Sequence, residues 1–190
     1  MVNIPPLRAR TQRGTSMVEV MVTIVILAIG LLGLAGLQSR LQASEMEAYQ
    51  RAQALVLLND MASRISANRA NAAAYVTGTA SPLGGTAVCP TATATRQQID
   101  ASEWCNALEG AGEADSGGNS VGAMVGGRGC VEDLGGGQYL VTVAWQGTTP
   151  ISAPVPACGQ NLYDGAAGSA CTGDRCRRVI TTVVRIGNLT

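Results

Sequence analysis

The stretch RGTSMVEVMVTIVILAIG, residues 13–30, decides the fold of this 190-residue chain. It passes from an arginine through a glycine into an apolar run that ends at residue 37 and contains only two clearly polar residues, Glu19 and Thr23. As a helix with a rise of about 1.5 Å per residue, residues 17–37 would span roughly 31 Å, which matches the hydrocarbon core of a bilayer. A membrane-spanning helix is therefore expected over residues 17–37.

The residues before this run are basic. Arg8, Arg10 and Arg13 precede Gly14, and no acidic residue does. Positive charge keeps that side of a membrane helix in the cytoplasm, so the rest of the chain is expected to be exported. A cleaved secretory signal peptide would have a shorter apolar core, of about 7–15 residues. A plain single-span anchor explains the length but not Glu19, because a carboxylate in a membrane helix usually marks a function.

The helical pattern continues beyond the apolar run. Apolar or small residues recur at steps of three or four, which is typical of one buried helical stripe: Leu41, Ser44, Ala48, Ala52, Leu55, Leu58, Ala62 and Ile65. A helix from about residue 16 to about residue 73 is expected, with its outer part packed on the rest of the chain. The glycines at 30, 33 and 36 either weaken this helix locally or form a small-residue face for another helix, and these two uses are compatible.

All the cysteines lie in the last 102 residues of the chain: Cys89, Cys105, Cys130, Cys158, Cys171 and Cys176. No pair has the spacing C-x-x-C, and the chain contains no histidine, so a zinc site is not expected. An even number of cysteines in an exported chain predicts up to three disulfides, whose pairing the spacing leaves open.

Composition and motifs argue against catalysis and nucleic-acid binding. The formal net charge is zero, and the expected folded part shows no extended basic cluster. Without lysine there is no P-loop, and without histidine there is no H-E-x-x-H motif. The segment GNSVG at 118–122 matches G-x-S-x-G, but a nucleophile elbow also needs a preceding strand, a following helix and a histidine base. The chain is predicted to be no enzyme and to need no metal or cofactor.

The C-terminal part predicts a small α+β domain. A short helix is expected in IDASEWCNALEG, with Asp100 as N-cap and Glu103 at the third position. A hairpin that turns at residues 135–137 is expected to lead into a strand over 138–146, and a last strand over 179–186. On the strand over 138–146, Tyr139, Val141, Val143 and Trp145 alternate onto one face, and on the last strand Ile180, Val184 and Ile186 share a face. Strands after one long helix favour an antiparallel sheet packed on that helix.

Residues 150–176 are rich in proline, glycine and alanine and predict a long loop stapled by disulfides. Such a loop is either a contact for a partner or a tolerated insertion. Arg175, Arg177 and Arg178 form a basic cluster that is expected to be a solvated strand edge. The alternative is a salt-bridging contact with another subunit.

The beginning of the chain resembles a type IV prepilin. A basic leader ends in Gly14, the mature chain would begin at Thr15, and Glu19 would be its fifth residue. The segment VEVMVTIVILAIGLLGLAGLQS is similar to that of PilV-like minor pilins, and the related minor pseudopilins of type II secretion share most of it. Most members begin the mature chain with phenylalanine, so Thr15 departs from the family. Later parts resemble the family more loosely, through GGRGCV and TTVVRIG.

This resemblance implies a leader at 1–14, a long helix at 15–73 and a periplasmic domain at 74–190. A prepilin peptidase would cut between Gly14 and Thr15 and could methylate the new amine. Glu19 would pair with the N-terminal amine of a neighbouring subunit during assembly. An ammonium and a carboxylate offset one another in an apolar medium, which would explain the acidic residue. The alternative is a glutamate held near the headgroups and partly hydrated.

The resemblance also implies partners and a location. The precursor would lie in the inner membrane, and the processed chain would join other minor pilins and the major pilin in a pilus or fimbrium, with adhesion and twitching motility as the associated activities. Two alternatives stay open: a minor pseudopilin of type II secretion, and a membrane-anchored periplasmic binding domain or adhesin whose first helix is only an anchor.

Overall fold

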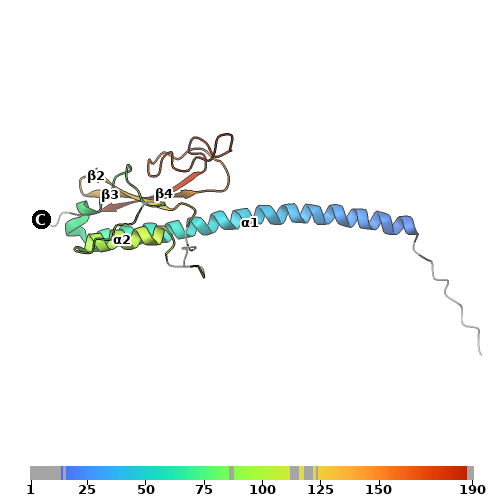
Figure 1. Cartoon of the computed structure of the whole chain (residues 1–190), viewed down its shortest axis with the longest axis horizontal. Coiled ribbons are helices and arrows are strands. Elements are labelled where there is room, and N and C mark those ends of the chain that lie inside the picture. Colours follow the sequence, from blue (N-terminus) through green and yellow to red (C-terminus); the bar gives the residue numbers. More distant parts are fainter. Residues whose placement is uncertain are drawn as a thin grey trace, which may run out of the picture. The chain divides into compact units, whose positions relative to one another are not determined.

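The computed structural model describes residues 14, 16–85, 88–111, 116–117, 122 and 124–187. The chain divides into two compact units, Met1–Gln42 and Ala43–Thr190. The helix α1, Met17–Ala67, begins in the first unit and ends in the second (Figure 1). In the first unit every residue of α1 is exposed.

The second unit contains a helix-and-sheet fold (Figure 1). After α1 the elements are η1 (Arg69–Tyr75), β1 (Leu83–Gly84), α2 (Arg96–Leu108), β2 (Arg128–Gly135), β3 (Gln138–Gln146) and β4 (Arg177–Arg185). The four strands form one antiparallel sheet in the order β1-β2-β3-β4. This arrangement confirms the predicted α+β fold, with a long helix packed on an antiparallel sheet.

The expected hairpin joins β2 to β3. Gly136 and Gly137 form its turn with φ angles of 60° and 72°, a left-handed conformation that glycine adopts without steric penalty. A register shift between Asp133 and Gly135 marks a bulge just before the turn. The hairpin therefore forms where the glycine run predicted it.

The main core lies between one face of the sheet and the helices. The four residues expected to share one face of β3 all contribute to it, as do Ile180 and Val184 of β4 and Ile186 just after the end of that strand. Trp104 of α2 is fully buried, and its indole nitrogen donates to the carbonyl of Leu57 on α1 at 2.9 Å. This hydrogen bond satisfies the only polar atom of a large buried side chain.

The buried stripe of α1 differs from the predicted one. Gln50, Ala54, Leu58, Met61 and Ile65 are its buried residues. Leu58 and Ile65 were expected there, but the expected Ala48, Ala52 and Leu55 are exposed. A stripe of small and apolar residues can be drawn on more than one face of a helix, and the packing partner selects the face.

The helix α2 begins earlier than predicted. Thr95 is its N-cap, and Thr95 and Gln98 form a reciprocal capping box. Asp100 is therefore not the cap but lies inside the helix, where it is 1% exposed. The correct signal was the earlier T-x-x-Q spacing, because glutamine at the third position can accept from the N-cap amide as glutamate does.

The long helix ends at Ala67, before the expected residue 73. Asn68 has φ −106° and ψ 42°, which is outside the helical region, and the chain continues as the 3-10 helix η1. Tyr75 at the end of η1 is buried, and its hydroxyl accepts from Asn68 at 3.0 Å. After the change of helix type, Tyr75 lies in the core of the second unit.

Candidate functional site

The first turn of α1 presents Glu19. The carbonyl of Ser16, the residue before the helix, accepts from the backbone amides of Glu19 at 2.9 Å and Val20 at 3.3 Å. The carboxylate of Glu19 is exposed and makes no ion pair with any residue that the structure describes. A negative charge at this end of a helix interacts favourably with the helix dipole. Glu19 is therefore available to a cation from outside the chain.

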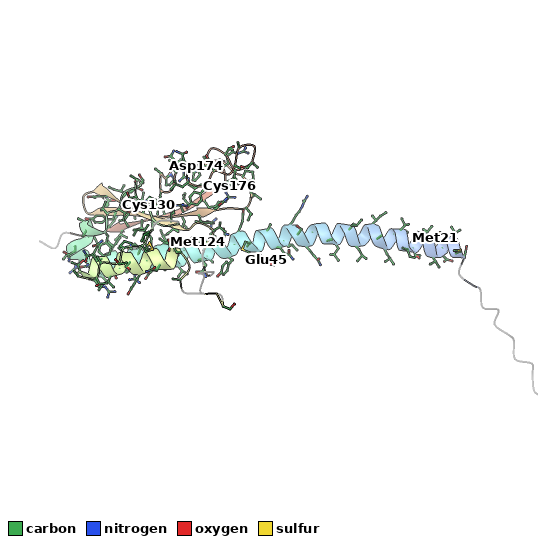
Figure 2. All side chains as sticks on the ribbon, viewed as in Figure 1. Met21, Glu45, Met124, Cys130, Asp174 and Cys176 are labelled. Carbon is green, nitrogen blue, oxygen red and sulfur yellow. A yellow bond between two sulfur atoms is a disulfide. The ribbon has the colours of Figure 1, made fainter. Side chains whose placement is uncertain are left out.

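The surface around Glu19 is apolar. By length and composition α1 can cross a membrane: an 18-residue window has a mean hydropathy of 2.7, and none of that window is buried. Large apolar side chains such as Met21, 60% exposed and labelled in Figure 2, point away from the helix. The hydroxyl of Thr23 donates to the carbonyl of Val20 at 2.8 Å, so this polar group is satisfied inside the helix.

The residues of the predicted cleavage site lie at the border of what the structure describes. Gly14 is exposed, and a Cβ added to it would meet no atom within 4 Å. Thr15 falls outside the described residues, as do residues 1–13 of the predicted leader. The three helical glycines at 30, 33 and 36 also have open space around them. Their use as a helix-packing face stays a prediction.

The six cysteines form three disulfides: Cys89–Cys105, Cys130–Cys158 and Cys171–Cys176. The first ties the segment before α2 to that helix, and the second ties β2 to the loop between β3 and β4. The third closes the end of the same loop. Glu109 places a carboxylate oxygen within 4.8 Å of the sulfurs of Cys89 and Cys105. Those sulfurs are bonded to each other, so they are not the thiolates that bind a metal.

The loop between β3 and β4 contains no helix or strand over 150–176, as predicted. It packs on the sheet face opposite the main core, where Cys130, Ala144, Cys158 and Tyr163 are buried together. Figure 2 shows Cys130 on the sheet and Asp174 and Cys176 in the region of this loop.

Arg177 corrects the prediction of a solvated arginine cluster. It is 1% exposed and pairs with the carboxylate of Asp174 at 3.3 Å. Its guanidinium also donates to three loop carbonyls, those of Pro154, Pro156 and Cys158. A buried charge is stable only with such partners. Arg177 therefore holds the loop in place and is not a strand-edge charge.

Arg178 is also engaged within the chain. Its Nη2 lies 3.2 Å from Oε1 of Glu47 on α1, and the same oxygen accepts from Thr148 and Thr149. Burial alone would raise the pKa of Glu47, but the hydrogen bonds from the two threonines and the charge of Arg178 together lower it. This contact fastens the start of the β3–β4 loop to α1.

A network around Asp100 connects α1, η1 and α2, and sequence reasoning missed it. Oδ1 of Asp100 accepts from Arg64 at 2.8 Å and lies 3.0 Å from Arg96, and Oδ2 accepts from the hydroxyl of Tyr75 at 2.6 Å. Arg64 also pairs with Asp60 and Glu103. The pair of Asp60 and Arg64 could have been predicted, because residues four apart are neighbours on a helix. The partners on α2 could not, because they are distant in sequence.

The comparisons with known proteins find one match. Residues 9–35 match the family model of the prokaryotic N-terminal methylation motif, which is the signal of type IV pilins and pseudopilins. The match indicates a type IV pilin or pseudopilin that prepilin peptidase processes. The long apolar helix fits a pilin anchored in the inner membrane. Neither the comparison with curated proteins nor the comparison with solved structures found a match.

Proposed function

We propose that this chain is a minor pilin of a type IV pilus. Its precursor lies in the inner membrane with the C-terminal domain in the periplasm. Prepilin peptidase cuts between Gly14 and Thr15, and the processed chain joins other minor pilins and the major pilin in a complex that starts or caps the pilus. The similarity of residues 18–39 to PilV-like minor pilins supports the minor class.

The observation that carries the proposal is the position of Glu19. It is the fifth residue after Gly14, in the first turn of an exposed apolar helix, without an ionic partner among the described residues. A charge placed alone in hydrocarbon is costly, and pairing with a cation offsets much of that cost. The new N-terminal amine of a neighbouring subunit is such a cation. The pairing would set the register of each subunit as it enters the filament.

The proposed chemistry is recognition without catalysis, metal or cofactor. The buried charged groups Asp100, Asp174 and Arg177 are each engaged in ion pairs that hold the domain together. The segment GNSVG at 118–122 lies mostly outside the described residues. A helix that packs on other helices and a domain tied by disulfides are sufficient for a filament subunit.

The decisive experiment is the intact mass and N-terminal sequence of the membrane-extracted protein, from cells with and without active prepilin peptidase. The proposal expects a chain that begins at Thr15 only when the peptidase is active. A chain that begins at Met1 in both cells would contradict it and would favour an ordinary anchored periplasmic domain or adhesin. The mass also shows whether the Thr15 amine is methylated.

A second measurement separates the two filament systems. Isolated surface pili should contain the chain, and its deletion should reduce piliation and twitching while type II secretion continues. Loss of secretion with normal piliation would instead identify a minor pseudopilin.

A further inference from the structure

The last strand forms one edge of the sheet. β4 pairs with β3 on one side, and no other described strand lies on its second side. Residues 179–184 of this strand, VITTVV, are all β-branched. Natural edge strands are usually protected by central charges, prolines, bulges or short length. Over these six positions β4 has no charge and no proline, and its pairing with β3 is regular.

The hydrogen bonds at its two ends show which backbone groups point outward. The amide of Ile186 donates to Gly137, and the amide of Gly147 donates to Cys176. In an antiparallel pair the residues that bond to the neighbouring strand alternate, so the even-numbered residues of β4 bond to β3. The amides of Val179, Thr181, Val183 and Arg185 therefore point to the open side, and none of them donates to another described residue.

A groove runs beside this open side, within the second unit. Residues 182–185 of β4 form one wall, and Asn59, Ala62, Ser63 and Ser66 of α1 form the other. Its volume is about 480 Å³. The small residues of α1 leave room next to the strand. Alternate side chains of an added strand would point into this groove.

The charges on β4 indicate what kind of strand fits. Arg177 and Arg178 are paired with Asp174 and Glu47, whereas Arg185 is exposed and has no ion pair among the described residues. In a fully overlapping antiparallel pair of two copies, Arg185 would lie opposite Arg177, which is already paired with Asp174, and residues 177–185 contain no carboxylate that could pair with Arg185. A carboxylate opposite Arg185 would be favourable.

We propose that the open edge of β4 accepts an extended segment of a different protein as an added antiparallel strand, with a carboxylate opposite Arg185 and apolar side chains in the groove along α1. Main-chain hydrogen bonds would supply the affinity, and the groove and Arg185 would supply the selectivity. This site is independent of leader cleavage, so the peptidase experiment and the test below can fail separately.

The test uses the full chain in detergent micelles and two synthetic peptides, acetyl-EVTVTVT-amide and acetyl-KVTVTVT-amide. Bound antiparallel, the first peptide would place its glutamate opposite Arg185 and its valines in the groove. We expect deuterium exchange of the outward amides of Val179, Thr181 and Val183 to slow at least tenfold with the glutamate peptide and much less with the lysine peptide. The inward amides of Ile180 and Thr182 are the internal control, because β3 already protects them.

Three variants sharpen the test. Arg185→Glu should reverse the preference between the two peptides. Val183→Pro removes an outward amide without removing a bond to β3, so it should abolish the protection, whereas Val183→Thr should retain it. If Val183→Pro also speeds exchange of the inward amide of Ile180, the substitution has disturbed the pairing of β4 with β3. The proposal is then judged on the peptide preference of Arg185→Glu alone.

Several results would overturn the proposal. These are unchanged exchange with both peptides, equal protection by both peptides, or no reversal in Arg185→Glu. The outward amides could also be protected without peptide. If that protection increases with protein concentration and sedimentation shows a dimer, a second copy occupies the edge and the proposal is wrong.

Discussion

The guanidinium of Arg64 on α1 lies 2.8 Å from the carboxylate of Asp100 on α2, and Asp100 is 1% exposed. The same carboxylate accepts from Tyr75 of η1 at 2.6 Å. One buried charge thus connects three consecutive helical elements of the second unit. Burial alone would raise the pKa of Asp100, but the hydrogen bonds from Tyr75 and Arg64 and the charge of Arg96 hold the pKa below its usual range.

The first prediction concerns the charge of Asp100. Asp100→Asn keeps the size of the side chain but removes the partner of Arg64 and Arg96, and it should lower the free energy of unfolding by about 1–3 kcal/mol. Urea unfolding of the full chain in micelles, followed by tryptophan fluorescence, measures this. Glu103→Gln is the matched control, because Glu103 is half exposed and its pair with Arg64 should contribute less than about 1 kcal/mol. Equal effects of the two variants would contradict the prediction.

The second prediction concerns acid stability. A carboxyl group whose pKa is lower in the folded than in the unfolded state stabilises the fold above its unfolded pKa, and this stabilisation is lost as the pH falls through the folded pKa. The pKa values of both Asp100 and Glu47 are lowered, so stability should decrease as the pH falls below about 4. Thermal unfolding between pH 7 and pH 2 checks this, and the acid-induced loss should be smaller in Asp100→Asn.

The third prediction compares two disulfides. Removing Cys130–Cys158 by a double substitution to serine should cost about 3.5 kcal/mol, and removing Cys171–Cys176 about 2 kcal/mol, since the first closes a longer loop. The sequence separations are 28 and 5 residues. Urea unfolding of both double variants gives the comparison, and the reverse order would show that loop length does not govern their contributions.

The fourth prediction concerns the packing of Trp104. A Cβ added to Gly129 on β2 would lie 2.1 Å from Cη2 of Trp104 and 2.8 Å from Cδ1 of Leu108. Gly129→Ala should therefore destabilise the domain by about 1–3 kcal/mol or more through overpacking. Gly187→Ala is the control, because a Cβ there meets no atom within 4 Å. The melting temperature of Gly129→Ala should be clearly lower than that of Gly187→Ala.

The fifth prediction tests the role of Glu19. Glu19→Ala should spare membrane insertion, since it makes the helix more apolar, but should reduce incorporation into filaments. The fractions of the chain in membranes and in sheared pili measure the two steps. Thr23→Ala is a control on the same helix, whose hydroxyl bonds only within the helix. Normal incorporation of Glu19→Ala would contradict the pairing mechanism.

Local features of the fold could be predicted because their causes are local. The run of apolar residues at 17–37, the glycine turn at 136–137 and the alternation in β3 depend on short spacings and on backbone conformation. The prediction for the N-cap of α2 was wrong because two capping patterns follow one another, at 95–98 and at 100–103, and Thr95 has the extended conformation of an N-cap whereas Asp100 lies inside the helix. The predicted face of α1 was partly wrong because small residues occur on several faces.

The sequence by itself determined the apolar helix, the position of Glu19 five residues after Gly14, and the number of cysteines. Only the tertiary structure decided which cysteines pair, that Arg177 is buried, and that Asp100 joins Arg64 to Tyr75. The physical reason is distance along the chain. Helix and strand periods follow from neighbouring residues, whereas a buried charge or a disulfide needs partners that only packing brings together.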